Sequence, residues 1–314
     1  MVEVLAFGRV LVDLYANETN TPLRHVRSFS KYLGGSAGNT AFGLARLGAR
    51  VGLISRVGND EFGAFLLERL QQEGVATNLV KVDPEYRTAL AIAALFPPAD
   101  SQVLFYRKPC ADTRVTVADI DRDTLLAAKL LVVNGTALSE SPSREAVLWA
   151  LEQRRSAGLI NVMDLDWRPM LWAHQDDARL YYGLALRQTD IALANESELA
   201  FAGLSDDPAK AAHHLLTLGV REVVAKRGGE GVILFRSDAG PLSVPPFRVE
   251  VVNTLGAGDG FAAAYCYGLL QGWAPENTLR FANAAGALVV SRHSCSEAMP
   301  TLAEVETLMA EGRK

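Results

Sequence analysis

The 314-residue sequence predicts an α/β fold with a mostly parallel central sheet between two helical layers and a small antiparallel β lid. Short apolar runs alternate with amphipathic segments along most of the chain, a pattern typical of a parallel sheet covered on both faces. Two strand-like runs joined by Pro97-Pro98-Ala99-Asp100 break this alternation and indicate a hairpin. We therefore expect one domain over residues 1–314, with a lid formed by about residues 10–34 and 88–110.

The expected strands are short apolar runs, and the expected helices show apolar residues at helical spacing. In the helix expected over residues 61–73, for example, Phe62, Phe65, Leu66 and Leu70 fall on one face. The main-sheet strands are expected at residues 2–7, 50–57, 130–133, 159–163, 191–194, 222–226, 232–235 and 249–252. Lid strands are expected at residues 29–33, 89–96 and 102–107, and the segment after residue 10 is expected to join them. The helices are expected at about residues 39–48, 61–73, 143–157, 175–187, 208–218, 261–270, 275–291 and 302–311.

Four polar residues come just after the ends of expected strands: Asp164, Asn195, Lys226 and Asp259. In open parallel sheets, ligands bind at the carboxyl ends of the strands. The sequence therefore predicts a binding site to which these four side chains contribute.

The stretch Asn253-Thr254-Leu255-Gly256-Ala257-Gly258-Asp259-Gly260 is expected to be a glycine turn that opens a helix. The first N–H groups of a helix have no internal partner, and with the helix dipole they form a pocket for an anion. A carboxylate beside such a pocket is what phosphoryl transfer to an alcohol requires. The alternative is that Asp259 only favours the first turn of the helix.

A second glycine turn, Gly34-Gly35-Ser36-Ala37-Gly38-Asn39, precedes another expected helix. It either lets a ligand approach the backbone closely or is a plain strand-to-helix turn. Asp13 lies in an apolar run, and a carboxylate there is functional or paired, because burying it alone is costly.

Composition excludes several classes of function. The chain carries 31 basic and 36 acidic residues, a net charge of −5, and no basic run that would indicate a nucleic-acid partner. Its three cysteines and five histidines lack metal-binding spacing, and the cysteines suit a reducing cytosol. It has neither a signal-peptide pattern nor a membrane-spanning run, so we expect a cytoplasmic protein. It contains neither a P-loop motif nor G-x-G-x-x-G after the first strand.

The two glycine turns together resemble the signatures of the ribokinase-like carbohydrate kinases, also called the phosphofructokinase-B family. Residues 253–259 are similar to the family's D-T-x-G-A-G-D signature, with Asn253 in place of the first Asp. The similarity covers nearly the whole chain. It implies a ribokinase-like three-layer sandwich that transfers a phosphoryl group from ATP to the primary hydroxyl of a sugar.

The resemblance also implies roles for individual residues. Asp259 would be the base, and the amides of Gly256, Ala257 and Gly258 would hold the charge that develops on the phosphoryl group. Asn195 and Glu198 match an N-x-x-E motif, with Glu198 placing Mg²⁺ through water; the alternative is a helix cap with a first-turn acid. The nucleotide side would comprise Asn195, Lys226, Gly228, Gly231, Asn283 and Ala287. The sugar side would comprise Asp13, Gly34, Gly35, Asn39, Tyr106, Arg107 and Arg168.

Some of these residues have simpler explanations. Lys226 is alternatively a solvated strand end, and Asn283 and Ala287 are alternatively part of ordinary helix packing. In many relatives an Asp at position 253 helps to bind a monovalent cation, so Asn253 leaves potassium activation open.

Within the family, residues 8–15, 105–112, 166–172 and 283–300 are most similar to kinases that phosphorylate 5-dehydro-2-deoxygluconate in inositol catabolism. A sugar acid brings a carboxylate, which arginine matches with two parallel N–H bonds. Arg107 and Arg168 could both point into one cleft, although each could also be a surface charge. Alternative substrates are 2-dehydro-3-deoxygluconate and fructose. A nucleoside kinase fits less well, and a sugar-responsive binding protein that has lost turnover is the non-enzymatic alternative.

The expected lid strands would close over the sugar and exclude water that would otherwise attack ATP. We also expect a homodimer formed through the lid, because such dimers are frequent in the family.

Overall fold

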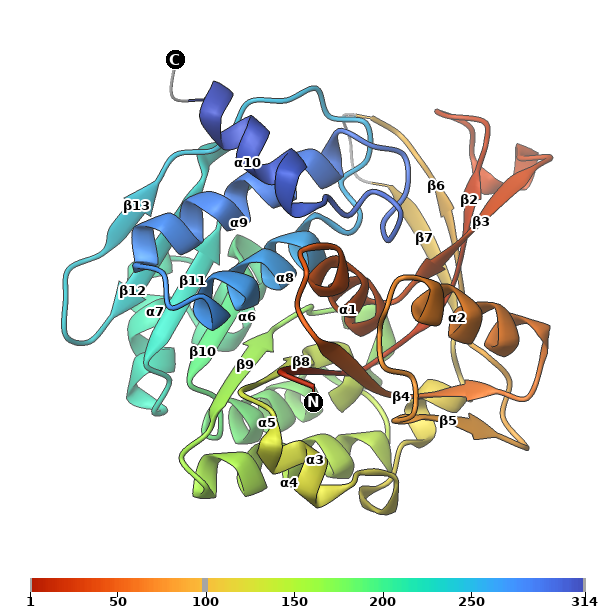
Figure 1. The fold of residues 1–314 in the computed structure, drawn as a ribbon, viewed down its shortest axis with the longest axis horizontal. Helices are drawn as coiled ribbons and strands as arrows, with labels where there is room; N and C mark the ends of the chain where they lie inside the picture. The colour runs from red at the N-terminus through yellow and green to blue at the C-terminus, as the bar shows by residue number, and fades with distance from the viewer. Residues whose placement is uncertain (1, 98–100, 313–314) are drawn as a thin grey trace.

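The computed structural model describes residues 2–97 and 101–312 and has a nine-stranded central sheet with helices on both faces (Figure 1). Across the sheet the strands lie in the order β13 (Leu242–Val244), β12 (Val232–Arg236), β11 (Glu222–Lys226), β10 (Ile191–Asn195), β9 (Ile160–Asp164), β8 (Leu130–Asn134), β1 (Val4–Phe7), β4 (Val51–Gly58) and β5 (Val80–Asp83).

Neighbouring strands from β11 to β5 are parallel, and β12 and β13 are antiparallel additions at one edge. From β1 the chain proceeds to β4 and β5 on one side, and only later to β8 and onward on the other. The strand order therefore reverses between β1 and β8. The crevice beyond the carboxyl ends of strands at such a reversal is where open α/β sheets bind ligands.

Two helical layers cover the sheet, and within the described ranges no helix is long and apolar enough to cross a bilayer. One layer consists of α1 (Ser36–Arg46), α2 (Glu61–Gln72), α8 (Ala257–Leu270), α9 (Pro275–Val290) and α10 (Leu302–Glu311). The other consists of α3 (Arg122–Ala127), α4 (Ser143–Ser156), α5 (Gln175–Leu186), α6 (Glu196–Gly203) and α7 (Pro208–Thr217).

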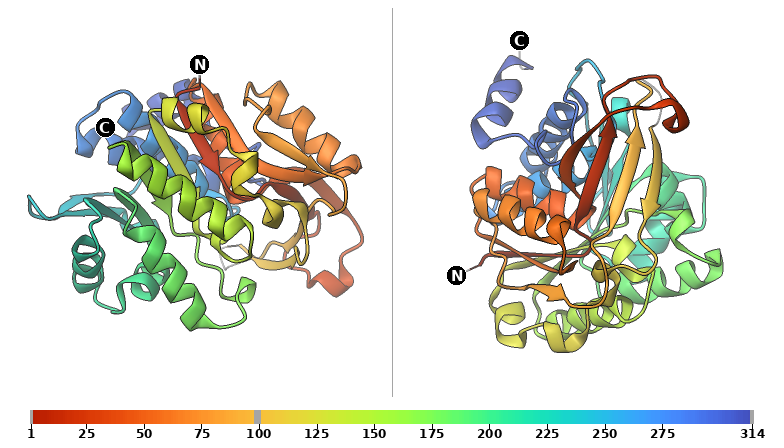
Figure 2. Two further views of the ribbon diagram at one scale, coloured as in Figure 1. Left: turned by 90° about the horizontal axis from the view of Figure 1, so that it is seen from below. Right: turned by 90° about the vertical axis from the view of Figure 1, so that its right-hand side faces the viewer.

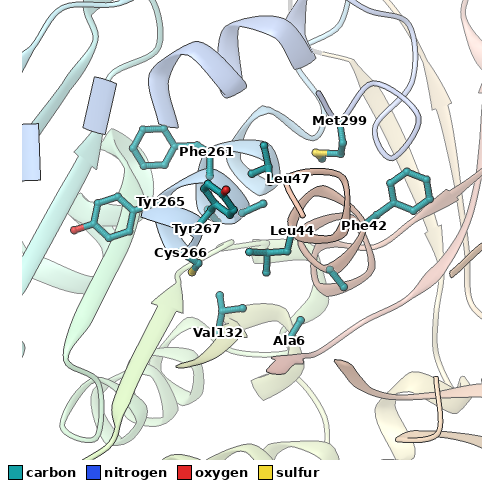
Figure 3. Packing of buried hydrophobic residues seen from close by; sticks show 14 of the residues in the cluster. Ala6, Phe42, Leu44, Leu47, Val132, Phe261, Tyr265, Cys266, Tyr267 and Met299 are labelled. Atoms are coloured by element: carbon teal, nitrogen blue, oxygen red, sulfur yellow. The ribbon is translucent and has the colours of Figure 1, made fainter. Parts of the chain in front are cut away.

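Each layer has its own apolar core, because alternate side chains of a strand point to opposite faces of the sheet. In β8, Val132 packs with α1 and α8, whereas Leu131 and Val133 pack with the other layer. Figure 3 shows Leu44 of α1 and Cys266 of α8 above Val132. Burying a large apolar side chain contributes about 1.5–3 kcal/mol, so this packing fixes α1 and α8 side by side over the centre of the sheet.

The lid is a separate four-stranded sheet that projects beside the main body (Figures 1 and 2). Its strands, in spatial order, are β3 (Phe29–Gly34), β2 (Leu11–Ala16), β6 (Leu90–Ala94) and β7 (Gln102–Tyr106). The outer pairs are antiparallel, as the sequence predicts, whereas the central pair of β2 and β6 is parallel. Segments about 80 residues apart in the chain thus form one surface: β2 and β3 lie between β1 and α1, whereas β6 and β7 follow β5.

Most predicted elements are confirmed to within a few residues, and α10 spans the residues expected for it. The strand expected at residues 249–252 is wrong, because the sheet already ends at β13. Instead, the N–H groups of Val252 and Asn253 donate to the carbonyl of Val290 at the end of α9, at 2.8 and 3.1 Å. Strands β5 and β13 were not expected. The turn expected at residues 97–100 lies largely outside the described residues, since Pro98, Ala99 and Asp100 fall in the gap.

Arg154 is a fully buried side chain that connects α4 with the end of α3, the loop before β8 and the start of β9. It donates five hydrogen bonds, to the side chain of Asn161 (3.2 Å) and to the carbonyls of Leu125 (2.6 Å), Ala128 (2.9 Å), Lys129 (3.2 Å) and Ile160 (3.0 Å). All five donors of the guanidinium are thereby satisfied, which offsets the cost of burying its charge.

We expect Arg154→Met to lower the free energy of unfolding by about 3 kcal/mol, because it leaves several buried carbonyls without a donor. Denaturant unfolding would measure this loss, and the melting temperature should fall by roughly 5–10 °C. Arg50→Met is the control, since Arg50 is exposed, and it should change stability by less than about 0.5 kcal/mol. A loss below about 1 kcal/mol for Arg154→Met would show that these carbonyls find other partners.

Candidate active site

A cavity of about 1050 Å³ lies where the lid, the carboxyl ends of the parallel strands and the N-termini of α1 and α8 meet. Of the residues that the sequence proposes for the site, most line it: Asp13, Gly35, Asn39, Arg168, Asn195, Glu198, Lys226, Gly228, Gly231, Gly256, Ala257, Gly258, Asp259, Asn283 and Ala287. Gly34, Tyr106 and Arg107 do not. The structure therefore brings residues that are up to 274 positions apart in the chain, from Asp13 to Ala287, around one space.

The N-terminus of α8 opens directly onto this cavity. Gly256 precedes the helix with φ of 83°, a conformation that favours glycine. A Cβ on Gly256 would also lie 3.0 Å from both Cβ and Sγ of Cys295, so a side chain has no room there. The turn thus leaves the first N–H groups of α8 uncovered, and these groups together with the helix dipole favour a negatively charged ligand.

Asp259 lies in the first turn of α8, and its Oδ2 accepts a hydrogen bond from Nδ2 of Asn39 in α1, at 2.8 Å. Burial and the nearby carboxylate of Asp166 together raise the pKa of Asp259 to about 8, against the opposing effect of the Asn39 bond. A carboxylate with a pKa near the working pH accepts a proton well and is still ionised often enough to act.

Lys226, the last residue of β11, lies beside the α8 turn. Its Nζ is 2.7 Å from Oδ1 of Asp164, and it lies 3.3 Å from where a Cβ on Gly258 would be. Burial opposes the charge on Lys226, but Asp164 and Glu198 outweigh this effect and raise its pKa. A protonated amine and the amides of an open helix N-terminus therefore face the same region, which suits phosphate oxygens.

Glu198 and Asn195 cap α6 reciprocally. Oδ1 of Asn195 accepts from the N–H of Glu198 at 2.9 Å, and Oε2 of Glu198 accepts from the N–H of Asn195 at 2.8 Å. The capping alternative from the sequence is thus confirmed, and both residues also line the cavity. Burial and repulsion from Asp164 together raise the pKa of Glu198 to about 7, against the opposing charge of Lys226.

The carboxylates of Asp164 and Glu198 suit a divalent cation, because burial raises the pKa of each and a bound cation would relieve that cost. Within residues 2–97 and 101–312, however, no cluster of three or more His, Cys, Asp or Glu side chains is arranged to hold a metal directly. The residues therefore fit a magnesium ion held partly by water and by phosphate oxygens rather than by a protein cage.

Asp166 is the most heavily bonded carboxylate of the site. Its partners are Ser36 Oγ (2.6 Å), Thr136 Oγ1 (3.1 Å) and Arg9 Nη2 (3.5 Å) at Oδ2, and Arg168 Nε (3.0 Å) at Oδ1. Burial disfavours its charge, but the two arginines outweigh burial and hold its pKa below the ordinary value. Asp166 therefore stays ionised and ties the ends of β1, β8 and β9 to the start of α1.

Asp13 projects from β2 of the lid, and burial raises its pKa to about 7 against the opposing charge of Arg9. Gly34 of β3 is paired with Leu11, two residues before Asp13, and a Cβ on Gly34 would fall 2.1 Å from Oδ2 of Asp13. Gly34 therefore makes room for the Asp13 carboxylate, although it does not line the cavity itself. A carboxyl group held in this way can exchange hydrogen bonds with hydroxyl groups of a ligand.

The far end of the cavity is built from the turn after β11 and from α9. Gly228 and Gly229 have open space where a Cβ would lie, so a flat ligand can approach the backbone there. Nδ2 of Asn283 donates to the carbonyl of Pro245 at 3.0 Å and fixes the loop after β13. Ordinary packing therefore explains Asn283, although Asn283 and Ala287 both also line the cavity.

The expectation that Arg107 and Arg168 point into one cleft is wrong for Arg107. Its side chain is buried and donates to Asp112 (2.6 Å), Ser139 (2.9 Å) and the carbonyl of Thr136 (3.3 Å). Tyr106, the neighbouring residue, is 59% exposed and lies outside the cavity, because successive residues of β7 point to opposite faces of the lid.

The sequence interpretation did not identify Arg9, Ser36 or Asp166 as site residues. Arg9 comes directly after β1, and a charged residue just past a buried strand was the available signal. Ser36 lies within the second glycine turn, which the sequence did indicate as a possible ligand site. Asp166 lies between Asp164 and Arg168, both of which the sequence did indicate as site residues. Thr136 contributes from the turn after β8, where the sequence gives no comparable signal.

Asn253 uses its amide to hold the loop before α8. Its Oδ1 accepts from the N–H of Leu255 at 3.0 Å, and its Nδ2 donates to the carbonyl of His293 at 2.9 Å. A neutral amide that donates to this carbonyl offers less to a monovalent cation than a carboxylate would.

Comparison with known proteins matches residues 1–302 to the pfkB family of carbohydrate kinases. A 5-dehydro-2-deoxygluconokinase from Geobacillus kaustophilus is 37% identical over 317 residues, covering 99% of this chain and 95% of that protein. One from Clostridium tetani is 36% identical over 319 residues, covering 100% and 94%. A solved structure described as ribokinase II from E. coli, in complex with ATP and Mg²⁺, matches with a TM-score of 0.91 and 27% identity over 99% of this chain and 100% of that one.

The fold expected from the resemblance is confirmed by this structural similarity, and the non-enzymatic alternative loses its support because the matched family consists of kinases. Since the family match covers almost the whole sequence and both relatives exceed 30% identity over nearly their full length, the chain belongs to the pfkB family of carbohydrate kinases.

Proposed function

We propose that this kinase transfers the γ-phosphoryl group of ATP to a primary hydroxyl of 5-dehydro-2-deoxygluconate. The observation that carries the proposal is the placement of Asp259 at the open N-terminus of α8, bonded to Asn39 and facing the cavity below the lid. The choice of substrate is supported by the two relatives named 5-dehydro-2-deoxygluconokinase, which are 36–37% identical over nearly the whole chain.

In the proposed reaction the hydroxyl oxygen of the sugar attacks the γ-phosphorus, and Asp259 takes the proton of that hydroxyl. The bond between the γ-phosphorus and the bridging oxygen breaks, and ADP leaves. The N–H groups of Gly256, Ala257 and Gly258 stabilise the negative charge that develops on the transferred group. Lys226, 3.3 Å from where a Cβ on Gly258 would be, adds a positive charge on the same side.

The nucleotide would occupy the end of the cavity formed by Gly228, Gly231, Asn283 and Ala287, with its phosphates toward Lys226. Glu198 and Asn195 would orient a magnesium ion through water. When bound, that ion supplies charge neutralisation for the phosphate oxygens.

The acceptor would lie on the lid side. Asp13 and Asn39 are placed to bond its hydroxyl groups, and Gly35 would let it approach the start of α1. Arg168, which lines the same space, would interact with its carboxylate. Closure of the lid would exclude water from the reacting groups.

We further propose that the protein forms a homodimer through the lid. Leu104 and Tyr106 of β7 and Phe29 of β3 are exposed apolar side chains on this sheet, and pairing of two lids would cover them. The mass of the protein in solution would decide between monomer and dimer.

The substrate is tested by ADP release with Mg·ATP and a panel of 5-dehydro-2-deoxygluconate, 2-dehydro-3-deoxygluconate, fructose, ribose and adenosine. We expect kcat/KM to be highest for 5-dehydro-2-deoxygluconate. Turnover confined to 2-dehydro-3-deoxygluconate would keep a sugar-acid kinase and replace the substrate. Turnover confined to fructose, ribose or adenosine would refute the sugar-acid assignment.

Asp259→Asn should lower kcat by about 10³-fold or more, because an amide cannot accept the hydroxyl proton. ATP binding, measured by calorimetry, should change little. The variant should also melt higher than the wild type at pH 8. The folded pKa of Asp259 lies above its ordinary value of 3.8, so wild-type stability falls as pH rises between these values. Retention of more than a tenth of kcat would exclude Asp259 as the base.

The pH dependence follows from the same carboxylate. Asp259 acts only when ionised and its pKa is about 8, raised by burial, Asp166 and Asp164 and lowered by Asn39 and Arg9. We therefore expect kcat/KM to rise with pH up to about 8 and then level off. Below about pH 7 the rise should steepen, because Glu198 also titrates there. A flat profile from pH 6 to 9 would contradict this assignment.

A further inference from the structure

Arg9 has unused hydrogen-bonding capacity at the wall of the cavity. It follows directly after β1, at the reversal of strand order, and is only 6% exposed. Among residues 2–97 and 101–312, only its Nη2 finds a partner, Asp166 at 3.5 Å, which is the edge of hydrogen-bonding distance. Within the described residues, neither Nε nor Nη1 has an acceptor. Buried donors without partners cost about 1–3 kcal/mol each, so this arrangement calls for an acceptor from outside the chain.

The role of Arg9 is not explained by holding Asp166. That carboxylate already accepts from Ser36 at 2.6 Å, Thr136 at 3.1 Å and Arg168 at 3.0 Å, all shorter than the contact with Arg9. Two guanidinium groups therefore share one carboxylate. The other carboxylates that act on Arg9 are Asp13 and Asp259, whose pKa values burial raises to about 7 and about 8, so near neutral pH they balance its charge only in part. An anionic ligand would complete the pairing of Arg9.

The surroundings of Arg9 place that anion on the lid side of the cavity. Its guanidinium carbon lies 5.0 Å from the centre of the Phe105 ring in β7, and the chain continues from Arg9 into β2 of the lid. A Cβ on Gly35 would lie 2.6 Å from the Arg9 carbonyl, so its backbone is fixed against the start of α1. Of the phosphate-binding groups proposed above, Lys226 and the turn after it lie instead at β11, and the N–H groups of Gly256, Ala257 and Gly258 lie at the start of α8.

We infer that Arg9 is a specificity-determining residue that donates hydrogen bonds to the carboxylate of an acidic acceptor, with Arg168 as its neighbour across Asp166. This inference rests on the proposed function and deepens it. Of the four cationic residues that line the cavity, Lys226 then serves the nucleotide phosphates, and Arg9 and Arg168 serve the acceptor; the fourth is Arg248. Replacing Arg9 should therefore lower kcat/KM far more for an acidic acceptor than for an uncharged acceptor of the same shape.

The test compares 5-dehydro-2-deoxygluconate with its uncharged methyl ester in the wild type, Arg9→Gln and Arg9→Lys. Arg9→Gln should raise KM for the acid about 30-fold or more and should lower the acid-to-ester ratio of kcat/KM by a similar factor. Arg9→Lys should recover part of that ratio, because it keeps the charge but loses the planar fork. Equal losses for acid and ester, or a change in the ratio below about threefold, would overturn the inference.

Arg107→Gln is the matched control, since Arg107 is a buried arginine that contacts Asp112 and Ser139 and does not line the cavity. It should lower the melting temperature and leave the acid-to-ester ratio unchanged. A fall in the ratio equal to that of Arg9→Gln would mean that any buried arginine near the lid has this effect, which would also overturn the inference.

Binding of D-gluconate and D-glucitol, measured by calorimetry, separates this inference from the substrate proposal because it needs no turnover. If the enzyme phosphorylates only neutral sugars, the proposed substrate is wrong. In that case, tighter binding of gluconate than of glucitol by the wild type, lost in Arg9→Gln, would still support the role of Arg9. Equal binding of the two ligands by the wild type would refute it.

Discussion

The carboxylate of Asp166 is the interaction on which the geometry of the cavity depends. Asp166 itself follows β9, and its backbone has a φ of 38°, which is uncommon for a residue other than glycine. Through it, groups that follow β1 and β8 and the first residue of α1 are held at fixed distances from one another. Because α1 packs beside α8, fixing the start of α1 also fixes Asn39, and Asn39 holds Asp259. One ion pair cluster thus connects the sheet, the lid and the proposed base.

The cavity concentrates carboxylates that are costly to ionise in the free protein. Burial raises the pKa of Asp13 and Glu198 to about 7 and that of Asp259 to about 8. Carboxylates with raised pKa values cluster at functional sites, because a bound substrate or cation supplies the hydrogen bonds or positive charge that the free protein lacks there. Hydroxyl groups of a sugar, a divalent ion and an acceptor proton would each satisfy one of these three residues. The site is therefore less stable without ligands than a neutral cavity would be, as expected where function is favoured over stability.

Arg9 and Arg107 illustrate how surroundings decide the role of a residue type. Both are almost fully buried, and both lie near the lid. Arg107 has Asp112, Ser139 and a carbonyl as partners, so it stabilises the junction of lid and body. Arg9 has two nitrogen atoms, Nε and Nη1, without an acceptor among the described residues, and it borders the cavity. Sequence patterns identify a charged residue at the end of a strand, but they do not show whether the fold itself supplies its acceptor.

The sequence by itself determined the α/β class, most element boundaries and the two glycine turns that precede α1 and α8, since these follow from local periodicity and backbone preferences. It also identified Asp164, Lys226 and Asp259 as residues that line the cavity, because polar residues at the ends of parallel strands lie along one edge of the sheet. Only the tertiary structure decided that residues 249–252 are not a strand, that β2 and β6 are parallel, and that Arg9 rather than Arg107 borders the cavity. These outcomes depend on which edges, carbonyls and carboxylates meet across long separations in the chain, and no local pattern encodes such meetings.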